Sequence, residues 1–220
     1  MIASVDGAAY VDGHSAGLGG PADRTLFGIL RSLADVIVVG ATTVREEHYR
    51  PARLSPELTD RRIGLGLGSY PPIAVLTRTC HLDWGTPLFT EAEQRTVVIT
   101  TETASAADRA DAARVADVVL AGDAEVSMQA AVVALAERGF ENALAEGGPR
   151  VLGQFVAAGL LDELCLTIAP YLVPGPEGRI VTAASSAPLV SLGLSHVLEA
   201  DGGYLFLKYS RRTNLDTRPS

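Results

Sequence analysis

Short apolar runs alternate with helix-like segments along most of this chain. One such run, DVIVVG at residues 35–40, is apolar on both faces, as a strand in the middle of a parallel sheet must be. Similar runs occur at residues 72–79, 95–101, 117–122 and 141–147, and helical spacing or composition marks residues 21–33, 106–115, 126–139 and 149–159. This alternation predicts an α/β fold with helices on both faces of a mostly parallel central sheet.

The pattern changes near residue 160, after which only strands are predicted. Residues 162–173 predict one long strand, and residues 195–210 predict a hairpin that turns at Asp201-Gly202-Gly203. We therefore expect antiparallel C-terminal strands to follow the parallel sheet. Residues 52–70 are polar and glycine-rich and predict an irregular surface loop.

Composition limits the classes of protein to which the chain can belong. Its 220 residues are 47% hydrophobic and 20% charged, which suffices for a packed core. We expect a single domain over residues 1–210 and a disordered polar tail over residues 211–220. The net charge of −8 argues against nonspecific binding to nucleic acid.

Cysteine use and hydropathy bear on the compartment. Cys80 and Cys165 form no CxxC pair, which favours ordinary buried thiols in a reducing compartment. His48, His81 and His196 have no metal-ligand spacing, so no metal site is predicted. No apolar stretch reaches the length of about 18 residues that spans a membrane. The N-terminus does not resemble a signal peptide, so the sequence predicts a soluble cytoplasmic protein without a membrane partner.

The turn Glu146-Gly147-Gly148-Pro149 joins a predicted strand to a predicted helix. In an open α/β sheet, ligands bind beyond the carboxyl ends of the strands, where this turn would lie. The first turn of a helix offers N–H groups to anions, glycine lets a phosphate approach the backbone, and Pro149 suits the first helical position. The turn therefore predicts a pyrophosphate-binding site, and a tight turn without a ligand is the alternative. It matches neither the Rossmann fingerprint nor the Walker loop.

Glu146 ends an apolar run, where a carboxylate costs free energy unless it has a partner. A functional role is one interpretation. The other is an acid at a helix N-terminus that backbone amides satisfy.

Four stretches together resemble the pyrimidine reductase domain of riboflavin biosynthesis. They are SVDG, LRSLADVIVVGATTVREEHYRP, AVLTR and LAEGGPRVLGQFVAAGLLDELCLTIAP, in the family's order from Ser4 to about Tyr209. Their order and spacing are more specific than any one of them. The resemblance implies a dihydrofolate-reductase-like fold with NADPH as the cofactor. The zinc deaminase signatures of bifunctional members are missing from this sequence, so the implied activity is reduction only.

The resemblance also assigns residues to the cofactor. The backbone at Ile2 and Ala3 would face the nicotinamide carboxamide. Thr77 and Arg78 would bind the adenosine 2′-phosphate through charge-assisted hydrogen bonds. Without the resemblance, Thr77 is a strand-end residue and Arg78 a solvated surface charge. The other residues implied to contact NADPH are Gly40, Thr43, Glu47, Gly147, Gly148, Pro149, Arg150, Val151 and Leu152.

On the substrate side, the resemblance implies Ser15, Arg31, Arg53 and Glu146. As a hypothesis, Glu146 anchors the pyrimidine or helps proton movement, and Arg31 or Arg53 binds the ribose phosphate. The helix dipole also favours a cation at position 31. Gly17 stands where family members often have an aromatic residue, which leaves the identity of the substrate open.

Asp6 is a further candidate catalytic residue, in an Asp-Gly pair at the end of a short predicted strand. Such a pair is usually a turn, so the alternative is that Asp6 organises the loop at Gly7.

The implied reaction is hydride transfer from NADPH to the ribosyl side chain of 5-amino-6-(5-phosphoribosylamino)uracil. Two alternatives stay open: an NADPH-dependent reductase of a pteridine or another heterocycle such as dihydrofolate, and a nucleotide-binding protein without turnover. Members of this fold family are commonly dimers, so we expect a homodimer.

Overall fold

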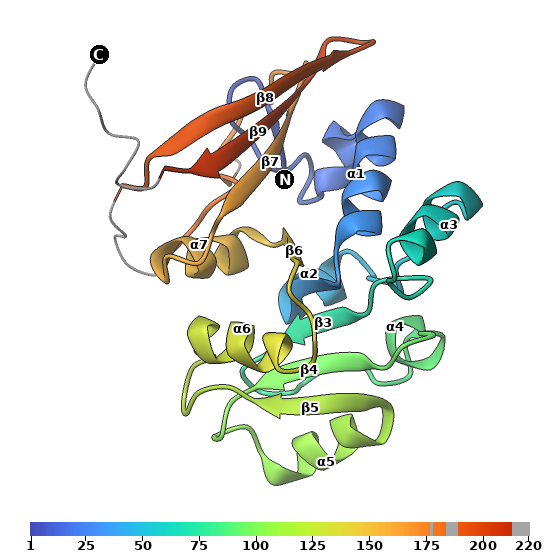
Figure 1. The fold of residues 1–220 in the computed structure, drawn as a ribbon. Helices are drawn as coiled ribbons and strands as arrows, with labels where there is room; N and C mark the ends of the chain where they lie inside the picture. Colours follow the sequence, from blue (N-terminus) through green and yellow to red (C-terminus); the bar gives the residue numbers. More distant parts are fainter. Residues whose placement is uncertain (177, 184–188, 213–220) are drawn as a thin grey trace. The chain divides into compact units, whose positions relative to one another are not determined.

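The computed structural model describes residues 1–176, 178–183 and 189–212 of the chain. The chain divides into two compact units (Figure 1), each built around its own β-sheet. The first unit contains Met1–Thr25 and the described residues from Leu152 onward, and the second contains Leu26–Val151. Helices α1 (Pro21–Leu33) and α7 (Pro149–Ala157) include the positions at which the chain passes from one unit to the other.

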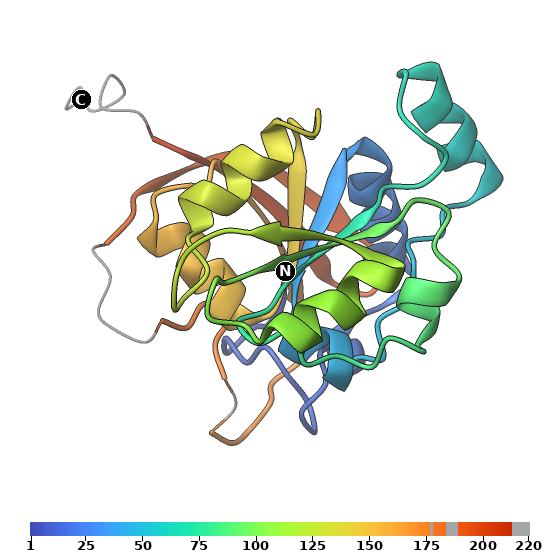
Figure 2. The ribbon, with the colours of Figure 1, turned by 90° about the horizontal axis from the view of Figure 1, so that it is seen from below.

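The second unit is an open sheet of five parallel strands in the order β5-β4-β3-β2-β6. Helix α6 lies on one face of this sheet, and helices α2 and α5 lie on the other (Figure 2). The predicted alternation of strands and helices is confirmed. The elements are β2 (Val36–Gly40), α2 (Ala41–Glu46), α3 (Pro56–Gly64), β3 (Ile73–Leu76), α4 (Pro87–Thr90), β4 (Thr96–Thr100), α5 (Ala106–Val115), β5 (Ala116–Leu120), α6 (Met128–Ala136) and β6 (Ala143–Gly147).

The core of the second unit includes the β-branched side chains of its central strands. Ile37, Val39, Val75 and Val98 are fully buried, at 0% exposure, together with Leu88 of α4. Burying one such side chain stabilises the fold by about 1.5–3 kcal/mol. Strands β2, β3 and β4 are buried along their whole length, as the apolar sequences of β2 and β3 and the β-branched sequence of β4 predict.

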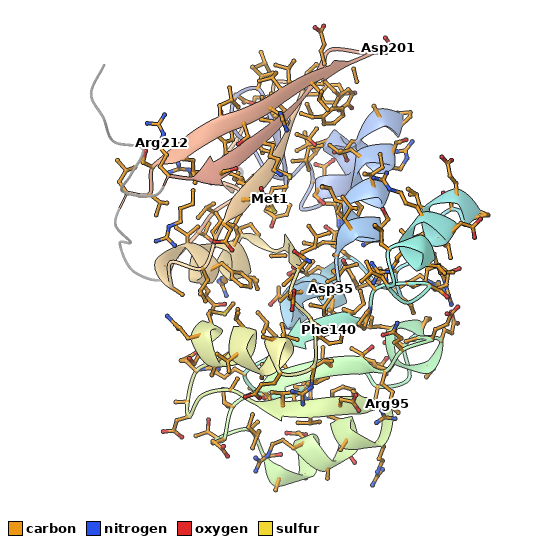
Figure 3. All side chains as sticks on the ribbon, in the orientation of Figure 1. Met1, Asp35, Arg95, Phe140, Asp201 and Arg212 are labelled. Carbon is orange, nitrogen blue, oxygen red and sulfur yellow. The ribbon has the colours of Figure 1, made fainter. Side chains whose placement is uncertain are left out.

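Asp35, just before β2, connects the amino ends of the neighbouring strands β2 and β6 through hydrogen bonds. Its Oδ2 accepts hydrogen bonds of 2.8 Å from the Glu141 amide and 2.7 Å from the Asn142 amide, just before β6. Figure 3 labels Asp35 and Phe140 at this end of the sheet. The contact fixes where β6 begins beside β2.

The first unit contains a four-stranded sheet in the order β1-β7-β9-β8. Its elements are β1 (Ile2–Ser4), η1 (Ser15–Leu18), β7 (Glu163–Ala169), β8 (Leu192–Ala200) and β9 (Tyr204–Arg211). Strand β1 runs parallel to β7, whereas β9 runs antiparallel to both of its neighbours, β7 and β8. The predicted hairpin is confirmed, and Asp201 marks its turn in Figure 3. Gly202 and Gly203 have φ values of +84° and +80°, which glycine adopts without steric cost.

The prediction of an irregular loop over residues 52–70 is wrong, because helix α3 occupies residues 56–64. The Ser55 hydroxyl caps this helix by accepting a 3.3 Å hydrogen bond from the Leu58 amide, and Pro56 takes the first helical position. The helix buries an arginine, Arg62, instead of an apolar stripe. Periodicity of hydrophobic residues could not reveal such a helix.

Further expectations concern the termini and the thiols. Arg211 ends β9, and residues 213–220 of the predicted tail lie outside the described residues. Cys80 is buried and Cys165 is half-buried, both are free, and burial raises the pKa of each thiol. No helix in the described ranges is both long enough and apolar enough to cross a membrane.

Candidate functional site at the carboxyl edge of the parallel sheet

Residues assigned to the cofactor from three strands meet at one edge of the five-stranded sheet. Gly40 ends β2, Thr77 directly follows β3, and Gly147 ends β6. Because these strands are parallel neighbours, their carboxyl ends lie together. The strand order changes direction between β2 and β6, and open α/β sheets bind ligands where the order reverses.

Glu146 is the extra residue of an irregularity in β6. Val38 of β2 pairs with Ala145, whereas the next residue, Val39, pairs with Gly147, so the register skips Glu146. A bulge of this kind turns a side chain away from the regular alternation, and bulges are frequent beside active sites.

The carboxylate of Glu146 forms a two-point ion pair with Arg31, in the last turn of α1. Arg31 Nε donates to Oε1 over 2.7 Å, and Arg31 Nη2 donates to Oε2 over 2.6 Å. The Glu146 side chain is 2% exposed and the Arg31 side chain 18%. Two of the four residues that the resemblance assigns to substrate are therefore brought together. Arg31 is the partner that a buried carboxylate at this position requires.

Tyr49 completes the arrangement and was not identified from the sequence. Its hydroxyl donates to Glu146 Oε2 and accepts a 3.0 Å hydrogen bond from Arg31 Nη2. Arg31 Cζ also lies 4.3 Å from the centroid of the Phe27 ring, one helical turn earlier in α1. Tyr49 stands in the stretch VREEHYRP, where an aromatic residue among charged ones is the only local signal. We call Arg31, Tyr49 and Glu146 the buried cluster.

Burial and charge set the protonation states within the buried cluster. Burial alone would lower the pKa of Arg31, but the hydrogen bond and the charge of Glu146 outweigh it and raise that pKa. Burial also raises the pKa of the Tyr49 phenol well above its usual value, and the negative charge of Glu146 raises it further. At neutral pH, Arg31 is a cation and Tyr49 a neutral hydrogen-bond donor.

This hydrogen bonding limits what Glu146 can do chemically. A carboxylate offers roughly four acceptor positions, and the two Arg31 donors and the Tyr49 hydroxyl occupy three of them. The remaining position suits one N–H donor of a ligand. Glu146 is thus an oriented, charge-balanced acceptor.

The glycines of the turn have separate structural reasons. Gly147 has a φ of +125°, which other residues rarely adopt, and apart from Gly147 and its two chain neighbours no described residue lies within 4 Å of the place where a Cβ would stand. The following peptide bond, Gly147–Gly148, is cis. Pro149 begins α7, as predicted. A Cβ on Gly40 would lie 2.9 Å from Val151 Cγ2, so Gly40 allows close packing of β2 against α7.

The predicted 2′-phosphate residues differ in exposure. Thr77 is buried, at 5% exposure, and its amide donates a 3.0 Å hydrogen bond to the Ile99 carbonyl of β4. Arg78 is exposed, and its Nη1 lies 3.3 Å from Glu125 Oε1. The hydroxyl of Thr101 donates a 3.0 Å hydrogen bond to the Arg78 carbonyl and fixes the backbone there.

The remaining residues assigned to the cofactor lie in or directly beside regular elements. In α2, the carbonyl of Thr43 accepts a 3.0 Å hydrogen bond from the Glu47 amide. Ile2 and Ala3 belong to β1, an edge strand of its sheet, so one side of their backbone takes no part in that sheet. Arg150, Val151 and Leu152 form the first turns of α7, and the last two are buried.

Arg53 makes its contacts elsewhere in the second unit. Its Nη1 lies 3.3 Å from Glu93 Oε1, its Nη2 donates 3.1 Å to the Glu91 carbonyl, and its Cζ lies 5.1 Å from the centroid of Tyr70. In the described part of the chain, none of these contacts involves the buried cluster.

Asp6 and Ser15 lie in the first unit. The Ser4 hydroxyl donates 2.5 Å to Asp6 Oδ1, and the Val173 amide donates 3.2 Å to each carboxylate oxygen. These bonds, that of Ser4 most, lower the pKa of Asp6 and keep it ionised. They support its role in organising the loop at Gly7, which is the alternative that the sequence left open. Ser15 begins the short helix η1.

The described residues contain no group of three or more His, Cys, Asp or Glu side chains arranged to hold a metal ion. The parallel sheet, with a glycine turn and an oriented carboxylate at its carboxyl edge, makes this an α/β protein of the kind that binds ligands at that edge, which is therefore the candidate site. The chain belongs to the RibD C-terminal domain family, which matches residues 1–206. The resemblance found in the sequence is thereby confirmed.

Two relatives are named 2,5-diamino-6-ribosylamino-4(3H)-pyrimidinone 5′-phosphate reductase. The one from Archaeoglobus fulgidus is 26% identical over 157 residues, which is 71% of this chain and 71% of that protein. The one from Methanothermobacter thermautotrophicus is 27% identical over 176 residues, which is 80% of this chain and 78% of that protein.

A solved structure supports the same family. The crystal structure of a pyrimidine reductase-like protein from Corynebacterium diphtheriae matches this chain with a TM-score of 0.85 at 28% identity. The match covers 97% of this chain and 90% of the other. The expected fold class, dihydrofolate-reductase-like α/β with antiparallel C-terminal strands, is confirmed.

Proposed function

We propose that residues 1–210 form a single NADPH-dependent reductase domain that reduces the ribosyl side chain of a 6-ribosylamino-pyrimidine 5′-phosphate. The observation that carries the proposal is family membership along residues 1–206, together with relatives named as reductases of such a compound. The substrate is 5-amino-6-(5-phosphoribosylamino)uracil or the 2,5-diamino-pyrimidinone of the relatives' name. These compounds differ at C2 of the ring, which bears an oxo group in one and an amino group in the other.

NADPH suits the carboxyl edge of the five-stranded sheet. The direction of a Cβ at Gly147 is open, which leaves room for a phosphate against the backbone, and α7 begins directly afterwards. In this proposal, residues 147–152, Gly40, Thr43 and Glu47 hold the phosphates and the adjoining groups. Ile2 and Ala3 meet the carboxamide, and Thr77 and Arg78 bind the 2′-phosphate. When bound, NADPH would supply the hydride for the reduction.

The buried cluster is assigned to the substrate. Glu146 retains one acceptor position, which orients a ring N–H or amino group of the pyrimidine. Arg31 is partly exposed. Its hydrogen bonds to described residues use Nε and Nη2, so its Nη1 is suited to the ribose phosphate. Arg31 fits this role better than Arg53, because Glu146, Tyr49 and Phe27 already fix its orientation.

The test is a steady-state assay of NADPH oxidation with each pyrimidine, with dihydrofolate as the control substrate. We expect turnover with at least one pyrimidine and none with dihydrofolate. Glu146→Gln should lower kcat/KM by about 10²-fold, since the variant replaces an ionic acceptor in the site. Tight NADPH binding without oxidation would replace the proposal with a nucleotide-binding protein. Turnover of dihydrofolate alone would indicate a pteridine reductase.

A homodimer is also proposed, with one face of the β8–β9 hairpin as its interface. Val197 pairs with Leu207 and Glu199 with Leu205, so the register places all four on one face. Val197 is 52% exposed and Leu205 38%, and exposed apolar patches of this kind mark interaction sites. We expect Val197→Asp to shift the protein from dimer to monomer in light scattering. A wild-type monomer would contradict the proposal.

We place the protein in the cytoplasm, where a reducing environment keeps its thiols free.

A further inference from the structure

Arg62 is a buried arginine whose partners are backbone carbonyls. The residue is 2% exposed. Its Nε donates a 2.6 Å hydrogen bond to the Gly68 carbonyl. Its Nη1 donates hydrogen bonds of 3.3 Å to the Ser32 carbonyl and 3.4 Å to the Arg31 carbonyl. The same nitrogen also donates to the Ala34 carbonyl. Burial lowers the pKa of Arg62, while the charge of Asp35 acts in the opposite direction.

Three of these carbonyls surround the end of α1, which finishes at Leu33. The last four carbonyls of a helix lack partners within the helix, and its C-terminus has a partial negative charge. Arg62, in α3, supplies the hydrogen-bond donors and the positive charge that this helix end lacks. It lies 28 to 31 residues after the carbonyls that it binds. It is therefore the C-terminal cap of α1.

The turn that Arg62 caps is the turn that contains Arg31. The Arg31 carbonyl accepts from Arg62, and the Arg31 side chain makes the two-point contact with Glu146. A two-point contact between a planar guanidinium and a carboxylate tolerates little displacement of either backbone. Movement of the last turn of α1 would therefore act directly on the buried cluster.

We propose that Arg62 is a positioning residue of the site: by binding the carbonyls at the end of α1, it holds Arg31 in register with Glu146. Its consequence for catalysis rests on the proposed function. Its consequence for the order of α1 does not. Arg62 itself is assigned no contact with substrate or cofactor.

The first experiment needs no substrate. Hydrogen exchange of the amides at the end of α1, residues 30–33, is compared in wild type, Arg62→Lys and Leu135→Ala. Leu135 is a buried residue of α6 and provides a control for general loss of stability. We expect Arg62→Lys to accelerate exchange at the end of α1 by about tenfold more than in α6. Equal acceleration throughout the protein, or none, would overturn the proposal.

The second experiment separates positioning from stability through kinetics. At a temperature where every variant is folded, Arg62→Met should raise KM for the pyrimidine about tenfold, and Leu135→Ala should leave it unchanged. In an Arg31→Met background, Arg62→Met should change KM by less than about twofold, because the residue that it positions is already lost. The same increase in both backgrounds, or an unchanged KM in the single variant, would contradict the assignment. If Arg62→Met does not fold, Arg62→Lys replaces it, with a smaller increase expected because the charge remains.

The two experiments fail independently. If the wild type reduces no pyrimidine, the proposed function is lost, and hydrogen exchange still decides whether Arg62 orders the turn of Arg31. If the wild type is active but the exchange is uniform, the function stands and the positioning role does not.

Discussion

Arg31 and Glu146 stand 115 residues apart in the sequence, and hydrogen bonds of 2.7 and 2.6 Å join their side chains. This contact links the last turn of α1 to the irregular end of β6. It also changes how the predicted substrate residues are understood. They form one charge-balanced unit with Tyr49, in which each member orients the others.

The first prediction concerns the stability of this pair. Arg31→Met leaves the Glu146 carboxylate buried without its cation, so we expect the free energy of unfolding to fall by about 3–5 kcal/mol. The double variant Arg31→Met/Glu146→Leu should be more stable than Arg31→Met, because it removes the unpaired charge as well. Urea unfolding followed by circular dichroism measures both.

An exposed pair in the same unit is the matched control. Arg50 and Glu91 lie 3.3 Å apart with both side chains more than half exposed. Arg50→Met should change the free energy of unfolding by less than about 1 kcal/mol. A similar loss for Arg31→Met and Arg50→Met would mean that burial adds nothing to the Arg31–Glu146 contact.

Tyr49→Phe should reveal the raised pKa of the phenol as a dependence of stability on pH. Up to about pH 10 the phenol is neutral in the folded and the unfolded protein. At higher pH the unfolded chain loses its proton first, since the folded pKa is raised. The stability that Tyr49 contributes is therefore complete below about pH 10 and is lost as pH rises toward the folded pKa.

The expected outcome is a difference between wild type and Tyr49→Phe that depends on pH. At neutral pH the variant should be less stable by about 1.5–3 kcal/mol, the value of a hydrogen bond to a charged group. Above about pH 10 the difference should shrink. A difference that stays constant across this range would show that the phenol has no raised pKa.

The strands and most helices could be predicted because each follows from a local pattern. β2 is a continuous apolar run, β4 is rich in β-branched residues, and Ser105 stands directly before α5, where its hydroxyl accepts a 3.0 Å hydrogen bond from the Asp108 amide. Helix α3 was missed since its buried residue is Arg62, whose partners belong to other segments. The signal that was present, Ser55 before Pro56, is a capping pattern and not a periodic one.

The candidate site was predicted in part for the same reason. Glu146, Gly147 and Pro149 were found because a strand-to-helix turn with glycines is a local feature. Tyr49 was missed because its partner Glu146 lies 97 residues away, and nothing near Tyr49 in the sequence indicates that contact. Arg31 belongs to the buried cluster, whereas Arg53 lies on the surface. This difference likewise depends on the tertiary fold.

The third prediction tests two glycines in different backbone conformations. Gly147 has a φ of +125° with open space around it, so Gly147→Ala should cost about 1–3 kcal/mol through backbone strain alone. Gly64, at the end of α3, also has open space, but its φ lies outside the left-handed region. Gly64→Ala should stabilise the protein by about 0.4–1 kcal/mol. Thermal unfolding of the two variants should therefore shift in opposite directions, and a shift in the same direction would refute this account.

The last prediction concerns the preference for NADPH, which the proposed function assigns to Thr77 and Arg78. Arg78→Ala should weaken NADPH binding by about 10- to 100-fold, the loss expected for hydrogen bonds to a charged phosphate, and should leave NADH binding unchanged. Glu125 lies 3.3 Å from Arg78 and competes for the same guanidinium. Glu125→Gln should therefore strengthen NADPH binding by up to about fivefold, the range of an exposed ion pair.

Thermal-shift titration with each dinucleotide measures these affinities, since a ligand that binds the folded state raises its apparent stability. Arg95 provides the control: it precedes β4 at the opposite edge of the sheet (Figure 3) and forms a similar exposed pair with Asp117 at 2.9 Å. Arg95→Ala should affect neither dinucleotide, because the 2′-phosphate is assigned to the carboxyl edge. If Arg78→Ala and Arg95→Ala weakened NADPH binding equally, the effect would be one of net charge. If wild type bound NADH and NADPH equally, neither Thr77 nor Arg78 could be the 2′-phosphate site.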